Sequence, residues 1–156
     1  MKVPIKTLEQ LREYIQAVRS YEVMHVQMTA CGLTEFPSEI FELADTLEIL
    51  DLSGNALSSL PDRLPELRKL KILFCAFNQF TELPRVLGQC HALSMIGFRN
   101  NPITVVSGES LPPMLRWLIL TGNQLESLPA ELGQRTRLQK LMVAGNRLQS
   151  LPDLST

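Results

Sequence analysis

Apolar residues recur along the chain in a frame that repeats about every 23 residues. Each unit opens with Leu-x-x-Leu-x-Leu and reaches an asparagine three residues later, most clearly in 47–57 and 115–125. The asparagines are separated by 23, 23, 22 and 23 residues, and a cysteine lies 24 residues before the first; these residues are Cys31, Asn55, Asn78, Asn101, Asn123 and Asn146. Six successive units in one frame indicate an internal repeat and not an isolated motif.

The middle of each unit predicts a short strand. Its fourth and sixth residues are apolar, and side chains alternate between the two faces of a strand, so both should enter one core. These positions hold Leu50/Leu52, Leu73/Cys75, Ile96/Phe98, Leu118/Leu120 and Leu141/Val143. One unit cannot bury this face alone, but stacked units can, which predicts a parallel sheet on the inner wall of an arc. Leu-Pro pairs then begin the outer return, where proline prevents a second ladder strand.

The residue that follows each strand is interpreted as structural. An asparagine amide at this turn can pair with backbone groups that would otherwise be buried without a partner. Cys31 takes the same place in the first unit. The fourth unit is one residue short, and 107–113 replaces its Leu-Pro frame, so we expect an irregular convex side there.

Residues 1–22 precede the repeats and predict an N-terminal capping helix. Thr7–Gln10 has the form of a capping box, and an apolar stripe follows at Leu8, Leu11, Ile15 and Val18. We expect this helix to cover Val26 and Met28; a partner-binding or membrane-surface helix is less favoured, because its other face is mixed in charge. Beyond Leu151 no capping helix is predicted, so the C-terminal edge is a candidate for self-association.

The sequence therefore predicts an α/β repeat solenoid, with six repeats in 23–156 forming a single domain. The frame is the leucine-rich-repeat signature, which implies a horseshoe with a parallel inner sheet. Its Leu-Pro variant resembles intracellular leucine-rich-repeat proteins of bacteria and of the Ras-linked eukaryotic scaffold group. Segments 31–55 and 115–123 look like the N-terminal repeat region of bacterial proteins in which such repeats precede a protein-kinase-like domain. That resemblance implies a binding or scaffolding role.

The net charge and the length of the apolar runs argue against a nucleic-acid partner and against membrane insertion. The chain has 15 Lys and Arg against 16 Asp and Glu, with no basic patch for a phosphate backbone, so we expect no nucleic-acid partner. Its longest apolar run, 72–77, is far below the roughly 18 residues of a membrane-spanning helix, so no membrane insertion is expected. Three cysteines without a CxxC spacing and an N-terminus without an apolar leader segment favour a cytoplasmic protein.

No motif for catalysis, a cofactor or a metal is present in the sequence. Cys90 and His91 are the only cysteine and histidine neighbours, but Cys90 replaces the leucine that closes its repeat, which favours a buried thiol over a catalytic dyad. His25 and Asp51 each lack a second group for metal or acid–base chemistry. We therefore expect no enzyme within this chain.

The third and fifth positions of each repeat should face away from the core onto the concave wall. They are unusually apolar in the middle repeats, and the predicted partner-binding residues are Ile49, Ile72, Phe74, Met95, Arg99, Trp117, Ile119 and Met142. Gly97 lies between Phe74 and Ile119 and predicts a dimple. A contiguous apolar patch usually marks an interface, although such residues can also serve only to pack against neighbouring strands.

Three functions are open on these observations. The first is a protein-interaction module or scaffold that binds another protein on the concave wall. The second is a regulatory arm whose apolar wall docks a catalytic domain of the same polypeptide. The third is a secreted bacterial effector. A downstream series of kinase motifs in the full reading frame would favour the second.

Overall fold

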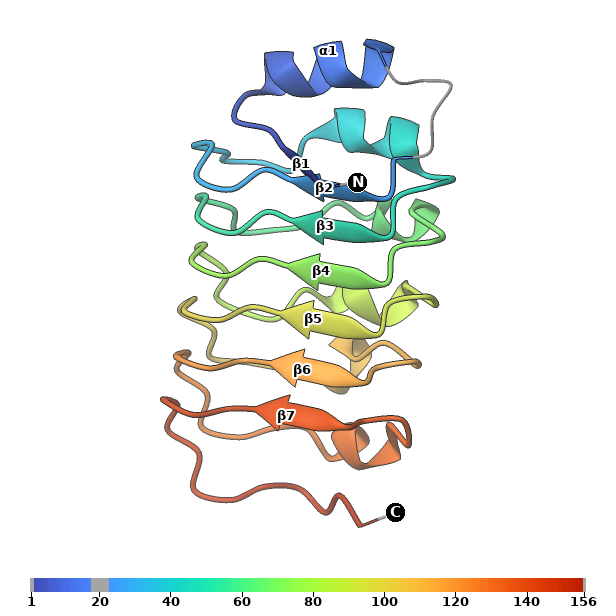
Figure 1. Ribbon diagram of the computed structural model, residues 1–156. Helices are drawn as coiled ribbons and strands as arrows, with labels where there is room; N and C mark the ends of the chain where they lie inside the picture. Colours follow the sequence, from blue (N-terminus) through green and yellow to red (C-terminus); the bar gives the residue numbers. More distant parts are fainter. Residues whose placement is uncertain (1, 18–22, 156) are drawn as a thin grey trace.

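A computed structural model describes residues 2–17 and 23–155 as a stack of similar turns (Figure 1). One parallel sheet runs through it in chain order, with each strand paired to the next. The strands are β1 (Lys2–Pro4), β2 (His25–Gln27), β3 (Ile49–Asp51), β4 (Ile72–Phe74), β5 (Met95–Gly97), β6 (Trp117–Ile119) and β7 (Lys140–Met142). The predicted solenoid and its inner parallel sheet are confirmed.

Five short 3₁₀ helices return the chain on the other side of the sheet: η1 (Ser38–Leu43), η2 (Leu64–Glu66), η3 (Arg85–Gln89), η4 (Gly108–Ser110) and η5 (Ala130–Gln134). Prolines immediately precede η1, η3 and η5, as the Leu-Pro pairs predict. The fourth unit has only the three-residue η4 behind a serine, in agreement with its irregular sequence. A Cβ at Gly88 in η3 would lie 1.8 Å from the carbonyl oxygen of Glu109, so the third unit needs glycine where the shortened fourth unit packs against it.

The core lies between the sheet and the 3₁₀ helices. Register stacks Leu50, Leu73, Ile96 and Leu118 directly above one another, and none of the four is exposed to solvent. Leu141 continues this column but is only half-buried, because no further strand follows β7 in the described chain. The column belongs to one continuous apolar cluster, so each repeat depends on its neighbours for burial.

The N-terminal cap is a strand followed by a helix, and the strand was not predicted. β1 pairs with β2 in parallel, and the Ile5 N–H then donates to the Gln27 carbonyl at 2.8 Å. The sheet thus has seven strands where the repeat frame predicts six. The frame missed β1 because residues 2–4 carry none of its leucines, and only pairing with the first repeat makes them a strand.

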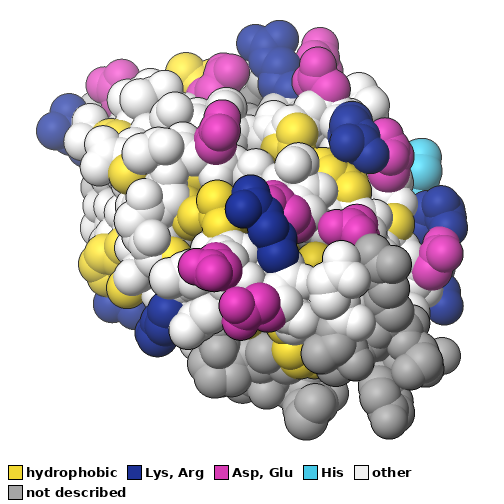
Figure 2. Space-filling view, turned by 90° about the horizontal axis from the view of Figure 1, so that it is seen from above, with side chains coloured by type: hydrophobic (Ala, Val, Ile, Leu, Met, Phe, Trp, Pro, Cys, Tyr) yellow, Lys and Arg dark blue, Asp and Glu magenta, His cyan; other side chains and the backbone are white. Residues whose placement is uncertain are grey.

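The predicted capping helix is confirmed as α1 (Leu8–Ala17). The Gln10 N–H donates to Thr7 Oγ1 at 3.0 Å, and the Gln10 amide oxygen accepts the Lys6 N–H at 2.8 Å, one residue before the donor of a standard capping box. Leu11 and Ile15 are buried, whereas Val18 lies outside the described residues. Side chains of both charge signs are mixed over this end of the molecule, as a solvated cap requires (Figure 2).

The asparagines link neighbouring repeats. In Asn78, for example, the amide oxygen accepts the Leu57 N–H at 2.9 Å, and the amide nitrogen donates to the Leu52 carbonyl at 3.0 Å, both in the preceding repeat. In the first repeat the Cys31 thiol donates to the Ile5 carbonyl at 3.1 Å. The cysteine therefore reaches back to the cap where later repeats use an amide.

Candidate binding surface

The face of the sheet turned away from the core, here called the open face, carries two rows of side chains. Register aligns the first row as His25, Ile49, Ile72, Met95, Trp117 and Lys140. It aligns the second as Gln27, Asp51, Phe74, Gly97, Ile119 and Met142. The predicted partner-binding residues therefore come together in adjacent strands, with Arg99 two residues beyond Gly97.

Most of these apolar side chains are half-buried. Ile49, Ile72, Phe74 and Trp117 have intermediate exposure, and Met142 is exposed at 42%. The core leucines of β3, β4 and β6, which are Leu50, Leu73 and Leu118, are fully buried. Side chains of this kind pack against their neighbours in the row and still keep apolar surface in contact with water.

A hollow of about 510 Å³ lies along the second row. Only some of the predicted partner-binding residues line this hollow, because its lining includes residues of the second row and none of the first. The lining residues are Asp51, Ser53, Phe74, Ala76, Gly97, Arg99, Ile119, Thr121 and Met142. Ser53, Ala76, Arg99 and Thr121 lie two residues beyond the second row, and three of these four side chains are small. The second row itself supplies the larger apolar side chains of Phe74, Ile119 and Met142. We call this hollow the second-row groove.

The dimple predicted at Gly97 is partly filled. A Cβ at this glycine would lie 2.8 Å from Cδ1 of Phe74 and 3.8 Å from Cβ of Ile119. The phenyl ring therefore lies across the glycine, which explains why Gly97 is buried although its strand position faces outward. Open space remains beside the ring, toward Ala76, Arg99 and Thr121. A side chain at this position would collide with the ring in its present place.

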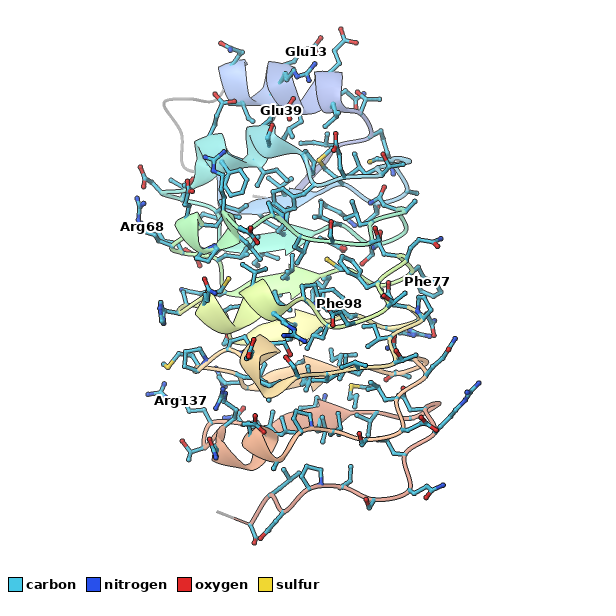
Figure 3. The ribbon with its side chains drawn as sticks, turned by 180° about the vertical axis from the view of Figure 1, so that it is seen from behind. Glu13, Glu39, Arg68, Phe77, Phe98 and Arg137 are labelled. Carbon is cyan, nitrogen blue, oxygen red and sulfur yellow. The ribbon has the colours of Figure 1, made fainter. Side chains whose placement is uncertain are left out.

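Phe77 is a surface residue that the repeat frame did not single out. Its side chain is 54% exposed, and its backbone φ is 54°, in the left-handed region. The equivalent turn positions in three other repeats hold glycine, as Gly54, Gly122 and Gly145. A bulky residue in this conformation costs about 1–2 kcal/mol. Ala30 (φ 55°) and Asn100 (φ 54°) hold the remaining equivalent positions in the same conformation. The available signal was the sequence itself, which places an aromatic residue where the other repeats have glycine, alanine or asparagine. Figure 3 shows Phe77 at the edge of the stack, whereas Phe98 lies inside it.

Cations gather around the β5–β7 part of the open face. The Arg99 guanidinium lies 5.8 Å from the centre of the Phe77 ring, and the Lys140 ammonium lies 4.4 Å from that of Trp117. Arg116 donates to the side-chain oxygen of Gln139 at 3.0 Å. Within residues 2–17 and 23–155, no carboxylate forms an ion pair with any of these three cations.

The β3 end of the groove has the opposite charge. The Asp51 carboxylate lines it and accepts the Ser53 N–H at 3.0 Å. Lys71, which precedes β4, lies outside the groove lining and is paired with Glu48 at 3.2 Å. The groove lining therefore carries one negative charge at Asp51 on β3 and one positive charge at Arg99, just beyond β5, while Arg116 and Lys140 lie outside the lining.

The cysteines are placed as structural residues. Cys90 is buried, and its thiol donates to the Val86 carbonyl at 3.6 Å. Burial raises the pKa of Cys90 to about 11, and burial, with a smaller contribution from the Asp51 charge, also raises that of Cys75. A thiol that stays protonated at neutral pH is a poor nucleophile. Among the described residues, no group of three or more His, Cys, Asp or Glu side chains could hold a metal ion.

Thiol labelling should follow this burial. At pH 8 in the folded protein, Cys31 is expected to react with a disulfide reagent about tenfold faster than Cys90, because it is only half-buried. The free energy of unfolding should also fall as the pH rises from about 9 to about 11, because the unfolded thiol ionises first. Cys90→Leu should reduce that loss. Equal labelling of all three cysteines before unfolding would contradict the assignment.

Comparisons with known proteins agree with this architecture. A family model described as Leucine Rich Repeat matches residues 46–67. The rat protein named leucine-rich repeat-containing G-protein coupled receptor 5 is 33% identical over 79% of this chain. Chicken lumican is 32% identical over 83% of the chain, and the probable inactive serine/threonine-protein kinase roco10 of Dictyostelium discoideum is 32% identical over 79%. This chain spans 14%, 39% and 5% of their respective lengths.

Solved structures share the fold over most of the chain. A leucine-rich-repeat protein of Leptospira interrogans has a TM-score of 0.70 and 26% identity, covering 97% of this chain and 44% of its own. The ectodomain of the Arabidopsis thaliana receptor kinase GASSHO1/SCHENGEN3, solved in complex with CASPARIAN STRIP INTEGRITY FACTOR 2, has a TM-score of 0.63 and 29% identity. It covers 80% of this chain and 16% of its own.

Among the described residues, no helix combines the length and the apolar character that crossing a bilayer requires. Strand order, stacked leucines, asparagine links and sequence similarity all point the same way. The chain is a leucine-rich-repeat solenoid, similar in sequence to proteins that carry the same repeat.

Proposed function

We propose that this chain is a protein-interaction module that binds a partner on the open face of its sheet. The observation that carries the proposal is the pair of half-buried rows on this face, with the second-row groove beside them. Aromatic residues, methionine and arginine are enriched at the centres of protein interfaces, and the two rows supply all three types. The role of the individual residues remains a prediction.

Packing between strands buries only part of each apolar side chain in these rows. Each side chain contacts its neighbours along the stack, but the surface directed away from the sheet stays in water. Burying apolar surface contributes roughly 25 cal/mol per Å². A partner that covered Ile72, Phe74 and Trp117 would gain binding free energy by burying apolar surface that the fold already presents on one face.

The complex formed by one structural neighbour supports the same class of function. The GASSHO1/SCHENGEN3 ectodomain is described in complex with another factor. That finding belongs to the neighbour, and for this chain it supports a binding role without naming a partner.

The proposal is tested by affinity capture. The intact chain is used as bait, captured proteins are identified by mass spectrometry, and the capture is repeated with Phe74→Ala and with Glu126→Ala on an outer turn. We expect Phe74→Ala to lose the partner and Glu126→Ala to retain it, with circular dichroism unchanged for both. Loss with Glu126→Ala alone would place binding on the turns and reject the open face.

A regulatory arm of a larger kinase-like enzyme is the second candidate. It is supported by the 32% identity to the probable inactive kinase roco10. In that case the open face would dock a domain of the same polypeptide. Kinase motifs downstream in the full reading frame, together with tighter binding in cis than to any separate protein, would favour this candidate. A secreted bacterial effector has only the similarity to the Leptospira protein in its support.

A further inference from the structure

We propose that the second-row groove takes an extended acidic segment of the partner, with an apolar side chain beside Phe74 and Ile119 and a carboxylate at Arg99. The inference rests on the proposed function, because it names the chemical class of segment that the open face binds. Three observations carry it: the shape of the groove, the opposite charges of Asp51 and Arg99 in its lining, and the exposed aromatic ring of Phe77 beside Arg99.

The groove has the dimensions of a short extended peptide. Its lining runs from Asp51 on β3 to Met142 on β7. Neighbouring strands lie about 4.8 Å apart, so the four intervals span roughly 19 Å, which is the length of about six extended residues. The small side chains beyond the second row leave room for a backbone. The larger apolar ones of the second row offer contacts for every second side chain of such a segment.

Charge decides which segment fits. Arg99, Arg116 and Lys140 contact aromatic rings or an amide and no carboxylate among the described residues, so each can still pair with an acidic group. Arg99 reaches the groove itself, and the other two lie on the far side of the second row. Asp51 would repel a carboxylate at the β3 end. Complementary potentials therefore place the acidic residues of the segment over β5–β7.

Phe77 supplies the third observation. Its ring is exposed, lies beside Arg99, and is held at a turn where glycine would be unstrained. Ala30 and Asn100 have the same left-handed backbone, so what distinguishes Phe77 is its exposed aromatic side chain. Arg99 lines the groove, and the Phe77 ring lies beside its guanidinium, next to that lining. We infer that Phe77 contacts the bound segment and holds Arg99 in place for its carboxylate.

The test is selection from a displayed library of random peptides of about seven residues, slightly longer than the groove. The parent chain should enrich peptides with net negative charge and at least one large apolar side chain. An enriched peptide is then synthesised, together with a control in which every Asp and Glu is replaced by its amide. Binding is followed by the fluorescence of Trp117, the only tryptophan in the chain. We expect the amide control to bind about tenfold more weakly.

Variants of the chain separate charge from shape. Arg99→Glu combined with Lys140→Glu should enrich basic peptides. Arg137→Glu changes a residue outside the groove lining, at the edge of the stack opposite to Phe77 (Figure 3), and should leave the acidic preference unchanged. Phe77→Gly should weaken the selected peptide about fivefold without lowering the thermal midpoint, because glycine relieves the strained turn.

Each outcome decides one of the two proposals. Failure to enrich any peptide, enrichment of neutral or basic ones, or an unchanged preference in the double variant would overturn the acidic segment. If Phe74→Ala loses the captured partner while the charge variants retain it, the binding face stands and only the acidic class fails. If the partner is retained by the Phe74 variant and by the charge variants, both proposals fail.

Discussion

Asn101→Ala is expected to lower the free energy of unfolding by about 3 kcal/mol. This side chain is 4% exposed and serves three buried backbone groups at once. Its amide oxygen accepts the Phe80 N–H at 3.1 Å, and its amide nitrogen donates to the Cys75 and Phe98 carbonyls at 3.0 Å each. Alanine would leave the Phe80 N–H and the Cys75 carbonyl without this partner, at a cost of roughly 1–3 kcal/mol for each group before relaxation. The Phe98 carbonyl keeps a hydrogen bond from the Asn123 amide nitrogen at 3.0 Å.

Asn146→Ala is the matched control. Its amide makes the same kinds of bonds, to Leu125, Leu120 and Val143, but the side chain is only half-buried on the last described repeat. Water can replace many of these hydrogen bonds there, so we expect the free energy of unfolding to fall by only about 1 kcal/mol. Urea denaturation of both variants gives the comparison. Equal losses, or none at Asn101, would show that the turns are satisfied in another way.

Trp117→Ala should weaken the captured partner about thirtyfold, which corresponds to roughly 2 kcal/mol. The indole is half-buried between Met95 and Lys140 in the first row, with the Lys140 ammonium over its ring. A large aromatic side chain at the centre of an apolar surface is the usual anchor of an interface. Because the ring lies outside the core, its removal should leave the far-ultraviolet circular dichroism unchanged.

Arg147→Ala is the control for that measurement. Arg147 is an exposed residue on a turn and belongs to neither row. Its substitution should leave affinity within about twofold of the parent, as is usual for contacts outside the centre of an interface. If calorimetry shows the reverse order, with Arg147→Ala weak and Trp117→Ala tight, the partner contacts the turns and the apolar rows only pack the sheet.

The repeat frame predicted much of the fold because its period carries three-dimensional information. Side chains alternate along a strand, so an apolar residue at the fourth and sixth positions places Leu50 and Leu52 in the core and Ile49 and Asp51 on the open face. A nearly constant repeat length then aligns equivalent positions in neighbouring strands. The two rows were thus predictable from the sequence, while their role in binding remains a prediction.

The sequence by itself determined the solenoid, the register of its repeats, the capping helix and the membership of both rows, because each follows from local alternation and a fixed period. Only the tertiary structure decided the pairing of β1, the position of the Phe74 ring across Gly97, and the meeting of Phe77 with Arg99. These features depend on contacts between residues about 20 positions apart, where the outcome is set by the space that neighbouring side chains leave. A periodic pattern predicts which face of the sheet a residue occupies, and side-chain packing determines which residues it contacts there.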